Sequence, residues 1–137
     1  MSLVLDGSTT LAWLYPDEGS PIASEAFELV AVEGAWVPSL WRLEVANSLQ
    51  IGIRRRRIDA AFRDAALVDL GRLNIAVDPD TDKLAWTAIL GLADRFRLTA
   101  YDAAYLELAH RRSLPLATLD RPLGAAARTL GVPLIGD

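Results

Sequence analysis

The chain of 137 residues contains no cysteine, one histidine and one lysine, and each shortage removes a class of site. Without cysteine there is no disulfide and no thiolate metal ligand, which suits a reducing cytoplasm, the location we expect. His110 alone is too few for a histidine-pair ribonuclease or a zinc site of the usual composition. No apolar run approaches the roughly 18 residues that span a bilayer, and residues 1–6 show neither the basic nor the long apolar region of a signal peptide. We therefore expect neither a membrane segment nor a secretion signal.

Positive charge is also in short supply, because 14 basic residues against 18 acidic ones give a net charge of −4. This value argues against attraction of nucleic acid by bulk charge alone. Thirteen of the fourteen basic residues are arginine, and four are consecutive: Arg54, Arg55, Arg56 and Arg57. The run is typical of a helix end, where cations offset the dipole, but it could also bind RNA phosphates or the acidic residues of a partner protein.

Hydrophobic residues make up 52% of the chain, enough for the core of one compact domain over residues 1–137. Short apolar runs of β type alternate with helical patterns, which predicts an α/β fold with a mainly parallel central sheet flanked by helices. Strands are expected at 3–5, 35–37, 74–77, 116–118 and 132–135. Helices are expected at 9–15, 21–33, 39–56, 60–73, 80–96, 99–112 and 121–130.

Two aspartates follow predicted strands directly. Asp6 comes after the first strand, and Asp120 comes after the strand near residue 117. In open α/β sheets, ligands bind at this carboxyl edge of the strands. If the two strands are neighbours, the two carboxylates lie close together. A structural role is open for each, since Asp6 could open a turn before Gly7 and Asp120 could cap the helix that contains Pro122.

Glu44 interrupts an apolar helix face. Residues 40, 44, 47 and 51 share one face by helical spacing, and Leu40 and Ile51 predict that this face points inward. Glu44 and Asn47 then lie where apolar side chains are expected. A buried carboxylate is costly unless it finds a partner, a metal ion or a cavity. The alternative is a boundary position with Arg42 or another arginine as partner.

Asp102 has a good structural explanation, because Thr99 and Asp102 match a capping box at a helix start. A cap can still serve in a site, since it holds the carboxylate rigidly. A cluster of Asp6, Glu44, Asp102 and Asp120 would suit hard cations such as Mg²⁺ or Mn²⁺, which take oxygen ligands. Such an ion activates water for attack at phosphorus.

Four segments together resemble the motifs of PIN-domain nucleases and, more narrowly, the VapC toxins of bacterial and archaeal toxin–antitoxin pairs. They are Val4–Ser8, Leu43–Asn47, Thr99–Ala109 and Leu116–Asp120. The similarity covers essentially the whole chain, with the motifs in the same order. Gly7 departs from the pattern, since relatives often carry a small side chain there, and its flexibility could loosen the turn that presents Asp6.

The resemblance implies a three-layer PIN-like domain in which the strands ending at Asp6 and Asp120 are adjacent. It implies that Asp6, Glu44, Asp102 and Asp120 bind Mg²⁺ or Mn²⁺ and cleave RNA. Ser8, Asn47 and Thr118 are expected to support these ligands. It also implies a homodimer, inhibition by a cognate antitoxin, and tRNA or rRNA as substrate.

Several other functions remain open from the sequence. A PIN nuclease of RNA processing without a toxin role, or a catalytically inactive PIN-like binding module, would share the same fold, although the presence of all four acids argues against inactivity. A phosphotransfer receiver domain needs a late lysine, and Lys83 lies within a predicted helix. A phosphatase of the haloacid-dehalogenase type needs a second acid where this chain has Ser8.

Overall fold

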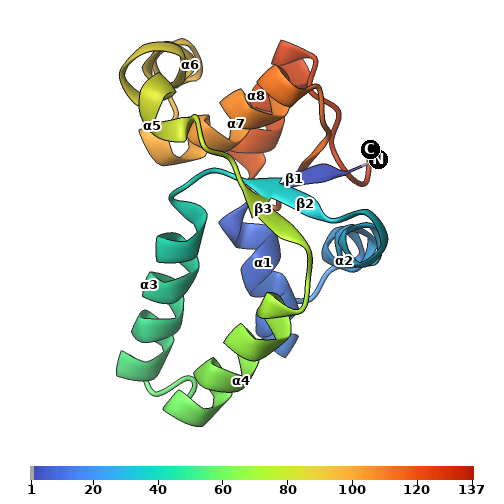
Figure 1. The fold of residues 1–137 in the computed structure, drawn as a ribbon, viewed down its shortest axis with the longest axis vertical. Coiled ribbons are helices and arrows are strands. Elements are labelled where there is room, and N and C mark those ends of the chain that lie inside the picture. Colours follow the sequence, from blue (N-terminus) through green and yellow to red (C-terminus); the bar gives the residue numbers. More distant parts are fainter. Residues whose placement is uncertain (1) are drawn as a thin grey trace.

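The computed structural model describes residues 2–137, and a parallel sheet of four short strands forms its centre (Figure 1). The strands are β1 (Leu3–Leu5), β2 (Ala35–Val37), β3 (Ile75–Val77) and β4 (Leu116–Ala117). They lie in the order β3-β2-β1-β4, and every neighbouring pair is parallel. The predicted α/β class and parallel sheet are confirmed.

Helices cover both faces of the sheet and give three layers. The first half of the chain supplies α1 (Gly7–Leu14), the short 3₁₀ turn Pro16–Glu18, α2 (Pro21–Glu33), α3 (Trp41–Arg54) and α4 (Ala60–Gly71). The second half supplies α5 (Thr81–Leu84), a π-helical turn (Ala85–Ile89), α6 (Leu90–Phe96), α7 (Ala100–Arg112) and α8 (Arg121–Leu130). In Figure 1, α7 and α8 lie on one side of the sheet and α1 and α2 on the other. Within residues 2–137, no helix is long and apolar enough to cross a membrane.

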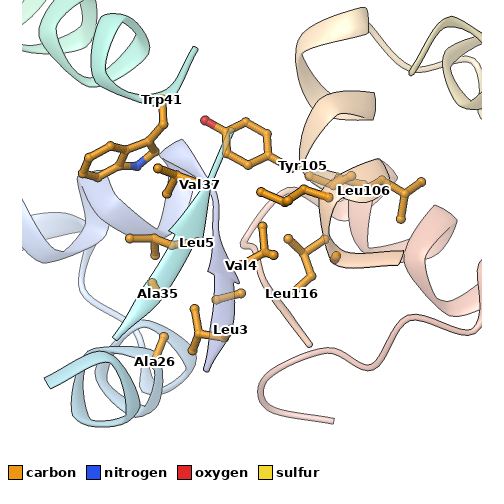
Figure 2. Packing of buried hydrophobic residues seen from close by; sticks show 14 of the residues in the cluster. Leu3, Val4, Leu5, Ala26, Ala35, Val37, Trp41, Tyr105, Leu106 and Leu116 are labelled. Carbon is orange, nitrogen blue, oxygen red and sulfur yellow. The ribbon is translucent and has the colours of Figure 1, made fainter. Parts of the chain in front are cut away.

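Strand β1 is the centre of the core. Leu3, Val4 and Leu5 are all buried, as expected for a parallel strand covered on both faces. Because side chains alternate along a strand, Leu3 and Leu5 point to one helix layer and Val4 to the other (Figure 2). Burying each such side chain stabilises the fold by roughly 1.5–3 kcal/mol. The core therefore fixes the position of the residue that follows Leu5.

Two predicted elements differ from the structure. The helix expected at 80–96 is interrupted by the π-helical turn. Ile89, at the end of this turn, and Ala93 of α6 pack in one cluster with Ala103 of α7. The strand expected at 132–135 is wrong in extent, because only a single bridge joins Leu134 to Leu116 of β4. The other elements appear with ends shifted by a few residues.

A buried ionic cluster connects the end of α7 to the sheet, and the sequence analysis did not predict it. Asp78 directly follows β3, and its side chain is fully buried. Its carboxylate accepts hydrogen bonds from Arg111 (2.7 Å) and Arg112 (2.8 Å). Arg111 also bonds Glu107 (2.7 Å), and the Arg112 guanidinium lies 3.6 Å from the ring centre of Trp36 on β2. The cluster therefore joins α7 to β2 and to the end of β3.

The charge on Asp78 is favoured in the folded state. Burial alone would raise the pKa of this carboxyl, but the bonds from Arg111 and Arg112 hold the pKa at about 2, below its ordinary value of 3.8. A depressed pKa contributes stability that is fully present above about pH 4 and is lost as pH falls towards 2. The difference corresponds to about 2 kcal/mol.

We predict that Asp78→Asn lowers the free energy of unfolding by about 3 kcal/mol at pH 7, since it leaves two arginines without their buried partner. Urea titration at pH 7 and pH 2.5 would measure this, and the gap from the wild type should narrow at the lower pH. The control is Asp69→Asn, because exposed Asp69 lies 3.6 Å from Arg72 and should change stability by less than about 0.5 kcal/mol. Equal losses in both variants would contradict the assignment.

Candidate active site

The four predicted acids line one cavity of about 260 Å³ at the carboxyl edge of the sheet. Strand β1 pairs with β4 in a register that places Leu5 opposite Ala117, so the residues after them are also adjacent. The expected adjacency of these two strands in the sheet is confirmed. Asp6, Glu44, Asp102 and Asp120 contribute to the cavity wall from four different segments of the chain.

Asp6 is the most deeply placed of the four, with 3% of its surface exposed. It is the N-cap of α1, and its Oδ1 accepts a bond from the Thr9 backbone N–H (2.9 Å). The Ser8 hydroxyl donates to the carboxylate at 2.8 Å, and the Thr118 hydroxyl donates a short bond to Oδ2. Burial raises the pKa of Asp6, and these hydrogen bonds offset only part of that rise.

Ser8 and Thr118 also join Asp6 to the loop that follows β4. The Ser8 hydroxyl accepts a hydrogen bond from the Leu119 N–H (3.0 Å), and the Thr118 hydroxyl accepts one from the Asp120 N–H (3.0 Å). Each hydroxyl therefore donates to one segment and accepts from the other. This arrangement locks the carboxylate in one orientation, which is the supporting position expected for both residues.

Glu44 reaches the cavity from the first turn of α3. Its Oε1 accepts a hydrogen bond from the buried Tyr105 hydroxyl (2.7 Å) on α7. The same oxygen packs against Gly7, where an added Cβ would overlap it. Burial raises the pKa of Glu44, as do the charges of Asp6 and Asp102, against the lowering effect of Tyr105. Tyr105 was missed as a site residue, although it follows Asp102 by three residues, about one helical turn, in the same motif.

The helix face predicted for Glu44 was wrong by one position. The buried residues of α3 are Trp41, Val45, Leu49 and Gly52. Glu44 lies at the edge of this face, half-buried and open to the cavity. Asn47 is exposed and its side chain makes no hydrogen bond within residues 2–137, whereas Ser48 lines the cavity. The structure therefore shows no contact through which Asn47 could support the acids of the cavity.

Asp102 and Asp120 combine cap and cavity positions. The Thr99 hydroxyl accepts a bond from the Asp102 N–H (3.1 Å), and Asp120 Oδ2 accepts one from the Leu123 N–H (2.9 Å). Both structural interpretations from the sequence are therefore correct, and both side chains still face the cavity. Burial raises the pKa of Asp102, and the charge of Asp120 adds to that rise, against a hydrogen bond from Thr99.

The arginine run ends α3, and its members differ. Arg57 pairs with Asp17 (2.7 Å) and Glu18 (2.8 Å) and lies over the Tyr15 ring. Arg54, Arg55 and Arg56 are exposed and form no ion pair among residues 2–137. Within the described residues, Glu44 has no arginine partner, and its side chain accepts a hydrogen bond from Tyr105 instead.

The donor set fits a hydrated divalent cation. Carboxylate oxygens are the ligands of Mg²⁺ and Mn²⁺. Burial raises the pKa of Glu44 and Asp102, and the charges of the neighbouring acids raise it further, a contribution that a bound cation would oppose. As placed in the described residues, no three acids converge closely enough to ligate one ion together. Mg²⁺ is usually held by one or two carboxylates plus waters, so the residues suit that mode rather than an all-protein cage.

We predict that millimolar Mn²⁺ raises the thermal unfolding temperature, because a ligand of the folded state alone stabilises it by about 2.7 kcal/mol at 100 times its Kd. Asp120→Asn should lose most of this rise while its side-chain oxygen still caps α8. Asp59→Asn is the matched control, since Asp59 caps α4 in the same way through the Phe62 N–H (2.8 Å), away from the cavity. No rise in the wild type, or the same loss in both variants, would contradict the site.

Comparison with known proteins agrees with this geometry. The family profile of the PIN domain matches residues 3–128. VapC ribonuclease Mb0985 of Mycobacterium bovis and Ribonuclease VapC9 of Mycobacterium tuberculosis are each 32% identical over 123 residues, which cover 86% of this chain and 85% of either relative. The crystal structure of PAE2754 from Pyrobaculum aerophilum has the same fold, with a TM-score of 0.68 at 24% identity over 92% of this chain and 84% of that one. The chain therefore belongs to the PIN-domain family, and within it to the VapC type.

Proposed function

We propose that this protein is a metal-dependent endoribonuclease that hydrolyses RNA phosphodiesters with Mg²⁺ or Mn²⁺ bound at Asp6, Glu44, Asp102 and Asp120. The observation that carries the proposal is the convergence of these four acids on one cavity, although each comes from a different segment. The relatives named as ribonucleases support it.

The chain's own residues hold the carboxylates ready for this chemistry. A bound cation would activate water for attack at phosphorus and neutralise charge on the phosphate. Ser8 and Thr118 fix the rotamer of Asp6, and Tyr105 fixes that of Glu44. An ionised carboxylate has about four lone-pair positions, so Asp6 keeps capacity beyond the hydrogen bonds it accepts.

The one histidine is placed away from this chemistry. His110 is exposed near the end of α7, eight residues after Asp102, which is about 12 Å along the helix axis. A general base or acid must lie within hydrogen-bond reach of the reacting group. The placement favours a metal-based over a histidine-based cleavage.

The VapC relationship supports a toxin role. We propose that the substrate is tRNA or rRNA in the cytoplasm, that its cleavage inhibits translation, and that the active protein is a homodimer neutralised by a cognate antitoxin. The alternatives are a PIN nuclease of RNA processing and an inactive PIN-like module. Growth arrest on expression, relieved by co-expression of a neighbouring small reading frame, separates the toxin from the processing enzyme.

We predict that the purified protein, freed of any partner, cleaves total bacterial RNA with Mg²⁺ or Mn²⁺ and not in EDTA. Asp6→Asn should reduce cleavage at least about 100-fold, since removal of one charge-stabilising group typically costs this much. Its circular dichroism spectrum should match the wild type, because the amide oxygen can still accept the Thr9 bond. Full activity in EDTA or in Asp6→Asn would overturn the proposal, and Asp59→Asn should stay active.

We predict that Tyr105→Phe lowers kcat about 10- to 100-fold, because a hydrogen bond to a charged group contributes roughly 1.5–3 kcal/mol. Without the hydroxyl, Glu44 loses its fixed position, so half-maximal activity should need more Mn²⁺ while KM for RNA stays nearly constant. Tyr101→Phe is the control on the same helix, since Tyr101 is 66% exposed. Equal kinetics in the two variants would show that Tyr105 does not position Glu44.

A further inference from the structure

Two further hollows adjoin the acid cavity, and each shares lining residues with it. The first lies between α1 and α3, shares Leu11 and Ser48 with the acid cavity, and extends to Arg55. The second lies beside α8, shares Asp120 with the acid cavity, and extends to Arg121. We use the name trough for the acid cavity together with these two hollows.

The charges along the trough alternate. Glu18 lines the first hollow and Asp137 the second, but Arg57 holds Glu18 at 2.8 Å and Arg128 holds Asp137 at 2.9 Å. Arg55 and Arg121 are exposed and have no ion pair or side-chain hydrogen bond among the described residues. The uncompensated charge is therefore positive at each end of the trough and negative in the middle.

The middle of the trough requires an unpaired substrate. Asp6 is 3% exposed, within a cavity of about 260 Å³, so a scissile phosphate must enter the cavity to approach a cation held there. A stacked duplex keeps its backbone on a regular helix, whereas loops and single strands can be splayed out by a protein. Arg55 follows Glu44 by eleven residues, about 16 Å along the α3 axis, so it can meet only a phosphate beyond the cleaved one.

We propose that Arg55 and Arg121 bind the RNA phosphates on either side of the cleaved bond, so that the strand follows the trough. The assignment rests on the proposed ribonuclease function and names two substrate-binding residues outside the acid cavity. Arginine suits this role, because its planar guanidinium bonds two phosphate oxygens at once. Arg54 is next to Arg55 and equally free, but it lines none of the three hollows.

The test measures binding of a fluorescein-labelled, 12-nucleotide, random-sequence RNA to Asp6→Asn protein in Mg²⁺, over a range of salt concentrations. In this background, Arg55→Ala and Arg121→Ala should each weaken binding about 3- to 10-fold. Each should also reduce the slope of log K against log salt by about 0.7, the value for one lost phosphate contact on a single strand. Arg54→Ala and Arg42→Ala are the controls and should keep the slope.

Further outcomes separate this inference from the proposed function. Equal effects in test and control variants, no binding at all, or tighter binding of a 12-base-pair duplex would overturn the trough assignment. If wild-type protein then still cleaves total RNA with Mn²⁺, the proposed function stands without it. Conversely, selective loss of binding in Arg55→Ala and Arg121→Ala supports the trough even where the wild type shows no cleavage, and in that case only the nuclease proposal fails.

Discussion

The pairing of β1 with β4 positions the most deeply buried acid of the site, because it brings the Thr118 hydroxyl into hydrogen-bond contact with the Asp6 carboxylate. The pairing brings the ends of two strands that are more than a hundred residues apart in sequence to the same place. A carboxylate buried there without partners would cost several kcal/mol. The chain offsets this cost with two hydroxyls and one backbone N–H, so the position of Asp6 follows from the register of the sheet.

Helix N-termini hold the acids of the cavity. Asp6 and Asp120 are N-caps, and Asp102 lies in the first turn of α7. The positive end of a helix dipole favours a negative side chain, so these positions stabilise charges that repel one another across the cavity. Glu44 lies in the first turn of α3 but relies on Tyr105 for its hydrogen bond. Local stability and a concentration of negative charge are therefore compatible.

The sequence predicted the four strands of the sheet, since β1 and β4, for example, are short apolar runs that end before a polar residue, but it also predicted a fifth strand at 132–135, where only one bridge forms. It also placed Asp6 and Asp120 at strand ends, and their adjacency came from the family resemblance. Helical periodicity failed for Glu44, because Trp41, Val45 and Leu49 form the buried face of α3, and a shift of one residue rotates a helix face by about 100°. The supporting role predicted for Asn47 rested on the same face assignment, and Asn47 is exposed. The pairing of Asp78 with Arg111 and Arg112 could not be predicted, since it joins residues whose contact depends on how α7 crosses the sheet.

The lack of a Cβ atom at Gly7 allows the Glu44 carboxylate to lie close to the start of α1. The carboxylate of Glu44 occupies the space where a side chain at position 7 would begin. A relative with alanine or serine there must keep its glutamate further from the first helix, by a shifted third helix or another rotamer. Residue 7 and the spacing between α1 and α3 are therefore expected to vary together during evolution. An acid cluster transplanted between such relatives, without the matching helix spacing, would bring the right residues into the wrong geometry.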